Sequence, residues 1–366
     1  MEIPKTHKAV VYDKPGEIST RIVELATPAP GPGQLLVKMT HSGICHSDLS
    51  LMTNKWSWLP EPVKSGQVGG HEGVGVVAQL GPSCEDAGVK TGDRVGIKWI
   101  ASACGNCMPC LAGADGICVN SQISGYTWPG TFQEYVLAPA RYVTPIPDGL
   151  ASAVAAPLLC GGVTVYSALK RSRAQPGDWV VIAGAGGGLG HLGVQLGGRG
   201  MGYRIIGLDT GPKEALVREC GAEAFIDITL ASSPAGDGGK GIIDEVLAIT
   251  GGTGAAAAII CSASNDAYSD ALSYLKFNGT VVCVGVPGEA KPIANAYPHL
   301  MVGKQLAIVG SNVGNRREAM ETLVMAKRVV TTPVRLEKLD NINQVFEGME
   351  GGKLQGRVVI DLQSST

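Results

Sequence analysis

The sequence predicts an α/β protein with two domains, one rich in short strands and one built on a parallel, doubly wound sheet. Three observations predict this fold class. The 366 residues are more than one compact core usually holds. The first 150 residues read as short strands separated by glycine and proline. After Pro157, strand and helix patterns alternate.

The β-rich domain is predicted from four strand-like segments near the N-terminus. Turn-forming residues separate them, for example the run from Pro28 to Gly33 and the pair Gly81-Pro82. Short strands with frequent turns favour a barrel-like arrangement. The segments are residues 7–12, 34–41, 73–80 and 93–100.

The second domain is predicted from the alternation that begins at residue 163, which is typical of a parallel, doubly wound sheet. We expect helices at 163–169 and 189–200, and strands at 178–183, 204–209, 222–227, 257–261 and 279–285. The Ser- and Gly-rich stretch 231–240 predicts a surface loop.

The end of the chain is expected to return to the first domain, through a helix at 317–327 and a strand at 356–362. The predicted first domain therefore comprises residues 1–161 with 311–366, and the predicted second domain comprises residues 162–310.

The charge balance and apolar pattern exclude several classes of partner. Lys and Arg total 30 and Asp and Glu total 32, and no basic stripe is present, which argues against nucleic acid and membrane surfaces. The N-terminus is mixed and polar, unlike a signal peptide, and we find no apolar run long enough to cross a bilayer. We therefore expect a cytoplasmic protein that acts on a small molecule.

Four of the ten cysteines lie close together, at Cys104, Cys107, Cys110 and Cys118. Four thiolates at this spacing can bind one Zn²⁺ tetrahedrally, and such a closed site is structural. Four unrelated buried thiols are one alternative, which the dense spacing disfavours. An iron–sulfur cluster is another, but no second cysteine set and no following proline support it. We expect the remaining cysteines to be buried thiols: Cys84, Cys220, Cys261 and Cys283.

Three separate segments contain further residues of metal-ligating type, namely Cys45 to Asp48, Gly69 to Gly75 and Pro157 to Gly162. Two thiolates and one imidazole from them would leave one tetrahedral position free, as in catalytic zinc sites. Asp48 can orient the His71 ring, and Glu72 can act as a transient ligand or an outer carboxylate. Each segment alone also fits ordinary core or surface residues, and spacing does not link the three.

A glycine-rich turn follows the predicted buried strand at 178–183 and opens a helix. Glycines there allow backbone N–H groups to approach a dinucleotide pyrophosphate at the helix N-terminus. Asp209 ends the next strand, where a carboxylate binds the ribose hydroxyls of NAD and repels the extra phosphate of NADP. An exposed acid at a strand end is the alternative. Lys213 is a candidate contact on the adenosine side.

Together these motifs resemble the zinc-containing medium-chain alcohol dehydrogenases. The resemblance rests on G-G-H-E-G-x-G from Gly69 to Gly75, C-H-S-D from Cys45 to Asp48, the four-cysteine loop and the glycine-rich turn. It extends in order over essentially the whole chain. The short stretch after Cys118 is most similar to the microbial tetrameric subtype. The resemblance implies a GroES-like catalytic domain, a Rossmann coenzyme domain and a homotetramer.

The resemblance also implies roles for individual residues. Cys45, His71 and Cys160 would hold the catalytic zinc, with Glu72 as an occasional fourth ligand, and Ser47 would take the substrate proton. The implied cofactor contacts are His46, Thr164, Gly184, Gly187, Gly188, Leu189, Gly190, Asp209, Lys213, Val284, Val286, Ser311, Val313 and Arg357. His46 and Arg357 would contact the pyrophosphate, and Thr164 would lie near the nicotinamide.

Three departures from the family pattern stand out. Many relatives have a histidine three residues after the proton-accepting hydroxyl, whereas this chain has Ser50. The pocket-lining stretch from 51 to 67 is longer and contains Trp56 and Trp58, so substrate preference does not carry over. Val286 stands where close relatives often have Met, which indicates a roomier pocket.

The implied function is hydride transfer between NAD(H) and an alcohol/aldehyde or alcohol/ketone pair, with two zinc ions per chain, one catalytic and one structural. One alternative is a zinc-free, NADPH-dependent ene or quinone reductase on the same fold. The other is a non-catalytic zinc-binding scaffold, which the open ligand set disfavours because a purely structural site would be closed.

Overall fold

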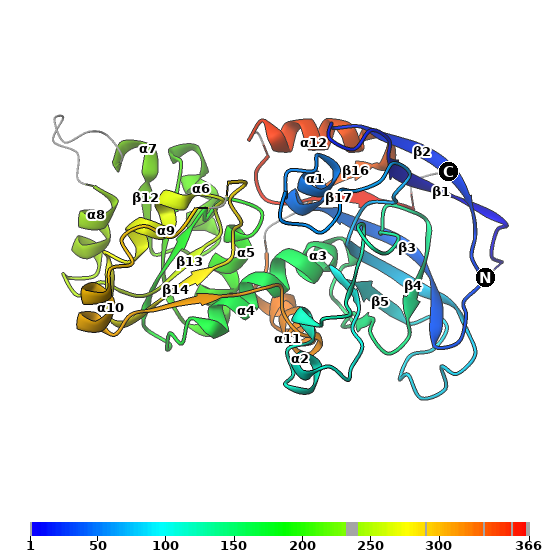
Figure 1. Ribbon diagram of the computed structural model, residues 1–366, viewed down its shortest axis with the longest axis horizontal. Helices are drawn as coiled ribbons and strands as arrows, with labels where there is room; N and C mark the ends of the chain where they lie inside the picture. The colour runs from blue at the N-terminus through cyan, green and yellow to red at the C-terminus, as the bar shows by residue number, and fades with distance from the viewer. Residues whose placement is uncertain (1, 232–240, 290, 332–333, 353, 364–366) are drawn as a thin grey trace. The chain divides into compact units, whose positions relative to one another are not determined.

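The computed structural model describes residues 2–231, 241–289, 291–331, 334–352 and 354–363 (Figure 1). The chain divides into two compact units. The first comprises Met1–Val163, Val313–Lys327 and Pro333–Thr366, and the second comprises Thr164–Asn312 and Arg328–Thr332. The sequence-based borders at 161/162 and 310/311 differ from these by two residues each, and the assignment of 328–332 to the second unit was not expected.

The first unit is built on a mostly antiparallel sheet with strand order β16-β17-β3-β4-β5-β9. Strand β3 organises it, because β4 pairs along one edge while β8 and β17 pair with the start and the end of the other edge. The strands are β3 (Gln34–Ile44), β4 (Glu72–Leu80), β5 (Arg94–Ile97), β8 (Tyr135–Pro139), β9 (Thr144–Pro145), β16 (Arg335–Lys338) and β17 (Val358–Asp361).

Alternating apolar residues of β3 explain its central place. Leu35, Val37 and Met39 are buried and pack with Phe132 and Phe346 in one hydrophobic core. Two short antiparallel pairs complete the strands of this unit, β1 (Thr6–Tyr12) with β2 (Thr20–Ala26), and β6 (Ile100–Ser102) with β7 (Gln122–Ile123).

The helical segments of the first unit are short. They are α1 (His46–Met52), α2 (Met108–Leu111), η1 (Asp115–Ile117), α3 (Ser152–Pro157), η2 (Leu158–Gly162), η5 (Leu339–Asn341) and α12 (Ile342–Glu350), with most of α11 (Arg316–Val329). The expected strands at 7–12, 34–41, 73–80 and 356–362 and the expected helix at 317–327 all correspond to observed elements.

The expected strand at 93–100 was wrong as a single element. The structure ends β5 at Ile97 and starts β6 at Ile100, in a different sheet. The chain breaks there because Lys98 turns inward, where its ammonium donates to Tyr142 O at 3.0 Å and to Thr144 Oγ1 at 3.1 Å. The same ammonium lies 4.3 Å from the centre of the Tyr142 ring.

The second unit contains, among the described residues, a six-stranded parallel sheet with order β12-β11-β10-β13-β14-β15. This is the doubly wound order whose direction reverses between β10 and β13, where such folds bind dinucleotides. The predicted fold class is thereby confirmed. The strands are β10 (Trp179–Ala183), β11 (Arg204–Asp209), β12 (Ala224–Asp227), β13 (Ala255–Ile260), β14 (Leu275–Cys283) and β15 (Ala307–Gly310).

Helices pack against the strands of this sheet (Figure 1). The helical segments of this unit are α4 (Val163–Arg171), α5 (Gly190–Gln195), η3 (Leu196–Gly200), η4 (Gly211–Lys213), α6 (Glu214–Glu219), α7 (Ile228–Ala231), α8 (Ile242–Ile249), α9 (Asn265–Ala271) and α10 (Pro298–Lys304). Most of the loop expected at 231–240 lies outside the described residues, and Ala231 ends α7 instead.

Two further expectations need correction. Cys84 and Cys220 are buried thiols as predicted, but Cys261 and Cys283 are only partly buried because they lie at strand ends. One apolar helical stretch among the described residues, Ser152–Arg171, does have the length and hydropathy of a membrane span. Since 83% of its 18-residue apolar window is buried inside the structure, it has the character of a core helix.

We expect Lys98→Met to alter the pH dependence of stability. Burial lowers the pKa of Lys98 to about 7 in the folded protein, whereas lysine in an unfolded chain has a pKa of about 10.4. Between these values the unfolded state binds more protons, so the wild type gains stability as the pH rises, by at most about 1.4 kcal/mol per pH unit. The methionine variant lacks this gain.

Urea denaturation of both proteins at neutral and at alkaline pH measures the effect. Lys64→Met is the matched control, since the Lys64 side chain is 82% exposed and its removal should leave the pH slope unchanged. Equal slopes in the wild type and Lys98→Met would contradict the prediction.

Candidate metal and dinucleotide sites

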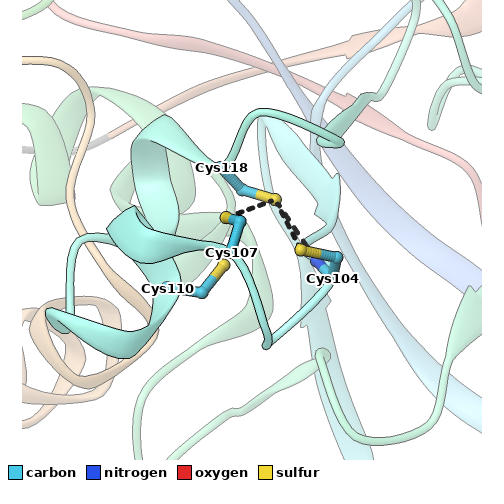
Figure 2. Close-up of side chains that lie close together, drawn as sticks. All are labelled: Cys104, Cys107, Cys110 and Cys118. Carbon is cyan, nitrogen blue, oxygen red and sulfur yellow. Dashed lines mark hydrogen bonds between the residues drawn. The ribbon is translucent and has the colours of Figure 1, made fainter.

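The four clustered cysteines converge on one point in the first unit (Figure 2). Their sulfur atoms all lie within 4.8 Å of one another, with Cys118 Sγ 3.5 Å from Cys104 Sγ and 3.8 Å from Cys107 Sγ. Cys118 is buried, but Cys104 is exposed and the other two are intermediate. Four unrelated buried thiols are therefore the wrong interpretation, and the set fits a tetrahedral metal site made only of sulfur.

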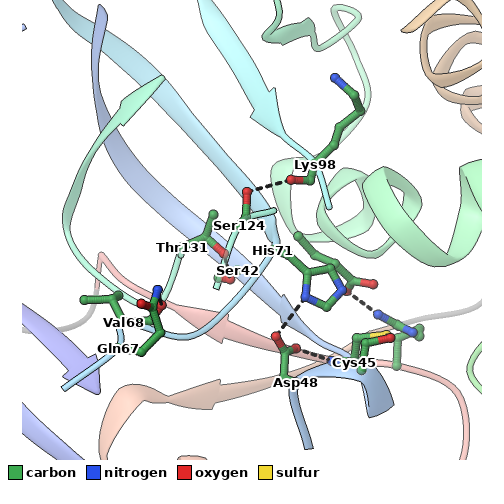
Figure 3. Close-up of polar contacts among 12 residues, drawn as sticks. Ser42, Cys45, Asp48, Gln67, Val68, His71, Lys98, Ser124 and Thr131 are labelled. Atoms are coloured by element: carbon green, nitrogen blue, oxygen red, sulfur yellow. Dashed lines mark hydrogen bonds and ion pairs between the residues drawn. The ribbon is translucent and has the colours of Figure 1, made fainter. Parts of the chain in front are cut away.

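The second cluster begins at α1, whose first residue follows Cys45. The carboxylate of Asp48 is fully buried and accepts the Cys45 backbone N–H at 2.9 Å, which closes the first turn of the helix. Its other oxygen accepts from His71 Nδ1 at 2.8 Å (Figure 3). One carboxylate thus fixes the backbone of Cys45 and the ring of His71, as the sequence-based hypothesis for Asp48 anticipated.

The chain enters His71 through a turn at Gly69 and Gly70, where larger residues do not fit. Gly70 has φ +92°, and a Cβ on Gly69 would lie 2.7 Å from the Tyr12 ring. The histidine is completely buried, and among the described residues no group hydrogen-bonds to its Nε2. With Nδ1 bound to Asp48, this unpartnered nitrogen is the one available to a metal.

Cys160 lies on η2, a single π-helical turn inserted between α3 and α4. Pro157 immediately precedes this turn, and π-turns recur at functional sites. A Cβ on Gly162 would lie 2.7 Å from a Leu158 methyl group, so the turn is also tightly packed. The turn directs the Cys160 thiol into the interior.

The four predicted ligands Cys45, His71, Glu72 and Cys160 come together, with their ligand atoms within 4.8 Å of one another and all four residues buried. The pKa of Cys45 is lowered well below its usual value, mainly by a hydrogen bond from Cys160 and also by His71, so a thiolate is favoured there. The donor set of two sulfurs, one imidazole nitrogen and a carboxylate fits zinc.

Glu72 has a partner that the sequence reasoning missed. One oxygen pairs with Arg357 Nη2, and no group of the described residues hydrogen-bonds to the other. Burial raises the pKa of Glu72 to about 7, while Arg357 acts in the opposite direction. A Cβ on Gly43 would collide with the Glu72 carboxylate, so this pair requires glycine on the neighbouring strand.

Ser47 lies on α1, together with His46 and Ser50. Ser47 is half-buried, and its hydroxyl lies 3.7 Å from Cys45 Sγ. Ser50, which replaces the histidine of many relatives, is buried and lies 3.3 Å from Nδ1 of the exposed His46. The structure therefore joins these two predicted positions in one polar contact.

The glycine-rich turn of the second unit lies between β10 and α5, at the reversal of strand order. Gly184 has φ +80°, and a Cβ on Gly190 would lie 2.1 Å from the Gly184 carbonyl oxygen. Asp209 is 5% exposed, which rules out the exposed-acid alternative. Its carboxylate accepts the Gly186 N–H at 2.9 Å and pairs with Lys213 at 3.1 Å.

The other predicted cofactor contacts divide between the units. Thr164, Val284, Val286 and Ser311 belong to the second unit, whereas His46, Val313 and Arg357 belong to the first. Gly187, Gly188 and Leu189 continue the turn into α5. The sequence reasoning also missed Trp99, whose ring meets His71 edge-on with centroids 4.9 Å apart. Its position between the two apolar strands β5 and β6 was the available signal.

Comparisons with known proteins agree with this arrangement. Residues 31–148 match the model of the alcohol dehydrogenase GroES-like domain, and residues 188–328 match that of zinc-binding dehydrogenase. Alcohol dehydrogenase 2 of Emericella nidulans is 58% identical over 364 residues, covering 99% of both chains.

Two solved structures extend the comparison. The alcohol dehydrogenase of Aeropyrum pernix has a TM-score of 0.82 and 30% identity, covering 97% of this chain and 99% of its own. Acetophenone reductase of Geotrichum candidum, solved in complex with NAD, has a TM-score of 0.83 and 25% identity over the whole of both chains.

We expect Asp48→Asn to weaken metal binding at the buried cluster by about 10–100-fold, because an outer carboxylate orients the ligating imidazole. Chelator competition followed by metal analysis measures the loss. The four-cysteine set provides the internal control, since the two Asp48 contacts described above do not involve it and its metal content should not change. Equal loss from both sets would contradict the prediction.

Proposed function

The chain belongs to the zinc-containing medium-chain alcohol dehydrogenase family, and from that premise we propose that it transfers a hydride between NAD(H) and an alcohol/aldehyde or alcohol/ketone pair at a zinc site formed by Cys45, His71 and Cys160. The buried convergence of these three ligand atoms is the observation that carries the proposal. Three protein ligands leave a fourth zinc position for substrate, as catalytic zinc requires.

Zinc, when bound, supplies a Lewis acid that lowers the pKa of an alcohol and polarises a carbonyl, and NAD supplies the hydride acceptor. The chain's own residues provide position and proton transfer. Asp48 binds His71 through Nδ1 and so leaves Nε2 as the nitrogen that would hold the metal. Arg357 balances the buried charge of Glu72, which keeps this carboxylate beside the ligands without requiring it to bind permanently.

Ser47 is the proposed proton acceptor, supported by its half-buried hydroxyl beside Cys45. A hydroxyl beside a substrate alcohol can accept its proton and pass it onward. The contact between Ser50 and His46 offers a polar continuation in a chain that lacks the usual histidine.

NAD rather than NADP is the proposed cofactor, supported by the buried carboxylate of Asp209 behind the glycine turn. A negative charge at this position repels a 2′-phosphate. The four-cysteine set is proposed to hold a second, structural zinc, since four sulfurs close the coordination shell. We propose a homotetramer on the resemblance alone.

A zinc-free reductase and a non-catalytic scaffold are less well supported. A zinc-free reductase would not need two sets of metal-ligating residues, and a structural scaffold would not need a site with one open position. Metal analysis separates the three, with two zinc ions per chain expected for the proposed function.

Loss of a ligand should abolish turnover. We expect Cys45→Ser or His71→Ala to lower kcat by at least about 10³-fold, because the Lewis acid is lost with the metal. NADH oxidation with acetaldehyde measures this. Cys84→Ser is the matched control, since it preserves the donor to Gln34 O and lies outside both clusters. Normal kcat in a zinc-depleted ligand variant would refute the proposal.

Asp209→Gly should reduce the preference for NAD, because it removes the charge that repels the NADP phosphate. The ratio of kcat/KM for the two cofactors is the measurement, with a fall of about tenfold or more expected. Asp209→Asn tests charge alone, since the amide oxygen can still accept the Gly186 N–H. Asp227→Gly, at the end of the neighbouring strand, is the control. An unchanged ratio in both Asp209 variants would count against this assignment.

A further inference from the structure

Asp115 lies inside the four-cysteine loop and contacts two segments outside it. The residue is half-buried and stands between Cys110 and Cys118 in the chain. One carboxylate oxygen accepts the Tyr142 hydroxyl at 2.6 Å and the Arg316 backbone N–H at 3.2 Å. Arg316 is the first residue of α11. The loop therefore supplies a carboxylate to the N-terminus of a helix that begins 201 positions later.

Two further contacts join the same loop to the start of α11. The Asn315 side chain donates to Gly113 O at 2.9 Å. A Cβ on Gly116 would lie 2.9 Å from Gly314 O, so the two stretches of backbone approach each other closely. A carboxylate at a helix N-terminus is favoured by the helix dipole and satisfies an N–H that has no partner within the helix. All of these residues belong to the first unit, and the loop and the start of α11 are thus fixed to each other.

The backbone just before α11 is strained. Val313 has φ +25°, a rare conformation for a β-branched residue. Such strain persists only where the surrounding structure holds it. On one side, the Ser311 N–H donates to Cys283 O at 3.0 Å. On the other side, Asp115 and Gly113 hold the two residues that begin the helix, so Val313 lies between two anchored segments.

This strained segment lies where a ligand is expected. It follows β15 at the carboxyl end of the parallel sheet, where doubly wound folds bind their ligands. The Ser311 hydroxyl is buried, and no group of the described residues hydrogen-bonds to it. A buried polar atom without a partner calls for an explanation, and a bound ligand at this edge would provide one. The family resemblance independently implies that Ser311 and Val313 contact the cofactor.

We propose that Asp115 is a positioning residue for the cofactor, because by holding the start of α11 it keeps Val313 in the conformation that binds NAD(H). The inference rests on the proposed function, and it gives the four-cysteine loop an effect on cofactor affinity in addition to a structural role. Asp115 itself touches neither cofactor nor substrate in this proposal. Its loss should therefore weaken NAD(H) binding and leave the rate at saturating cofactor nearly unchanged.

The test compares the full-length, zinc-loaded wild type with Asp115→Ala and Asp115→Asn. Fluorescence titration gives the Kd for NADH, and initial rates with acetaldehyde give kcat and the KM for NADH. For Asp115→Ala we expect Kd and KM to rise about tenfold, with kcat and zinc content within about twofold of the wild type. Asp115→Asn keeps an oxygen acceptor and should recover most of the affinity. Asp148→Ala removes an exposed carboxylate of the same unit and should change none of these values.

These variants should fold, since α11 has its own N-terminal cap. The Asn315 N–H donates to the Glu318 carboxylate at 3.0 Å, and the Glu318 N–H donates to the Asn315 side chain at 2.8 Å. Tyr142→Phe is a milder second variant, which retains the ring and removes one hydrogen bond to Asp115. It should raise the Kd for NADH about threefold.

A double-mutant cycle tests the route through Val313. Glycine adopts a positive φ without steric cost, so Val313→Gly removes the strain that the anchored segments oppose. In that background, Asp115→Ala should raise the Kd for NADH by less than about threefold. The full tenfold rise in the glycine background would overturn the proposed role of Asp115, because Val313 would then play no part in the effect.

The remaining outcomes separate this inference from the proposed function. Unchanged NADH affinity in both Asp115→Ala and Tyr142→Phe would overturn the inference and leave the dehydrogenase intact. A parallel loss of kcat, zinc and NADH affinity would also overturn it, since Asp115 would then act on the stability of the whole first unit. A wild type that holds zinc yet neither binds NADH nor reduces an aldehyde would overturn the proposed function, and the inference with it.

Discussion

The buried carboxylate of Asp48 is the constraint on which the metal cluster depends. It binds the backbone of Cys45 and the ring of His71, and therefore sets the positions of two ligands from different elements. A fully buried carboxylate is costly unless its oxygens are satisfied, and here both accept hydrogen bonds. Asp48 consequently couples the start of α1 to the glycine turn before His71, and the positions of the ligand atoms depend on both.

Features with a local signal were predictable from the sequence. The four-cysteine loop and the glycine turn after β10 each lie within one short window, and the alternation of strand and helix predicted the parallel sheet. The contact between Glu72 and Arg357 was not predictable, because it depends on β17 pairing with β3, and these residues are 285 positions apart. Ligands far apart in sequence were linked by family resemblance, since their spacing carries no geometric information.

The second unit uses one carboxylate for two purposes. Asp209 accepts the Gly186 N–H and so shapes the turn, and it also presents negative charge where cofactors differ. Turn geometry and the proposed cofactor preference therefore depend on the same side chain. The Lys213 ammonium pairs with the same carboxylate, so the position of this ammonium also depends on Asp209.

The chain order of the first unit constrains how the protein can be made. The predicted ligands all precede residue 161, but the guanidinium that balances Glu72 belongs to Arg357, and the segment of the second unit lies between them. The ligands are translated first, so the end of one edge of β3 stays unpaired while the main segment of the second unit is translated. The predicted ligand cluster can reach its final charge balance only after Arg357 has been translated, which makes the late pairing of β17 with β3 a required step in its formation.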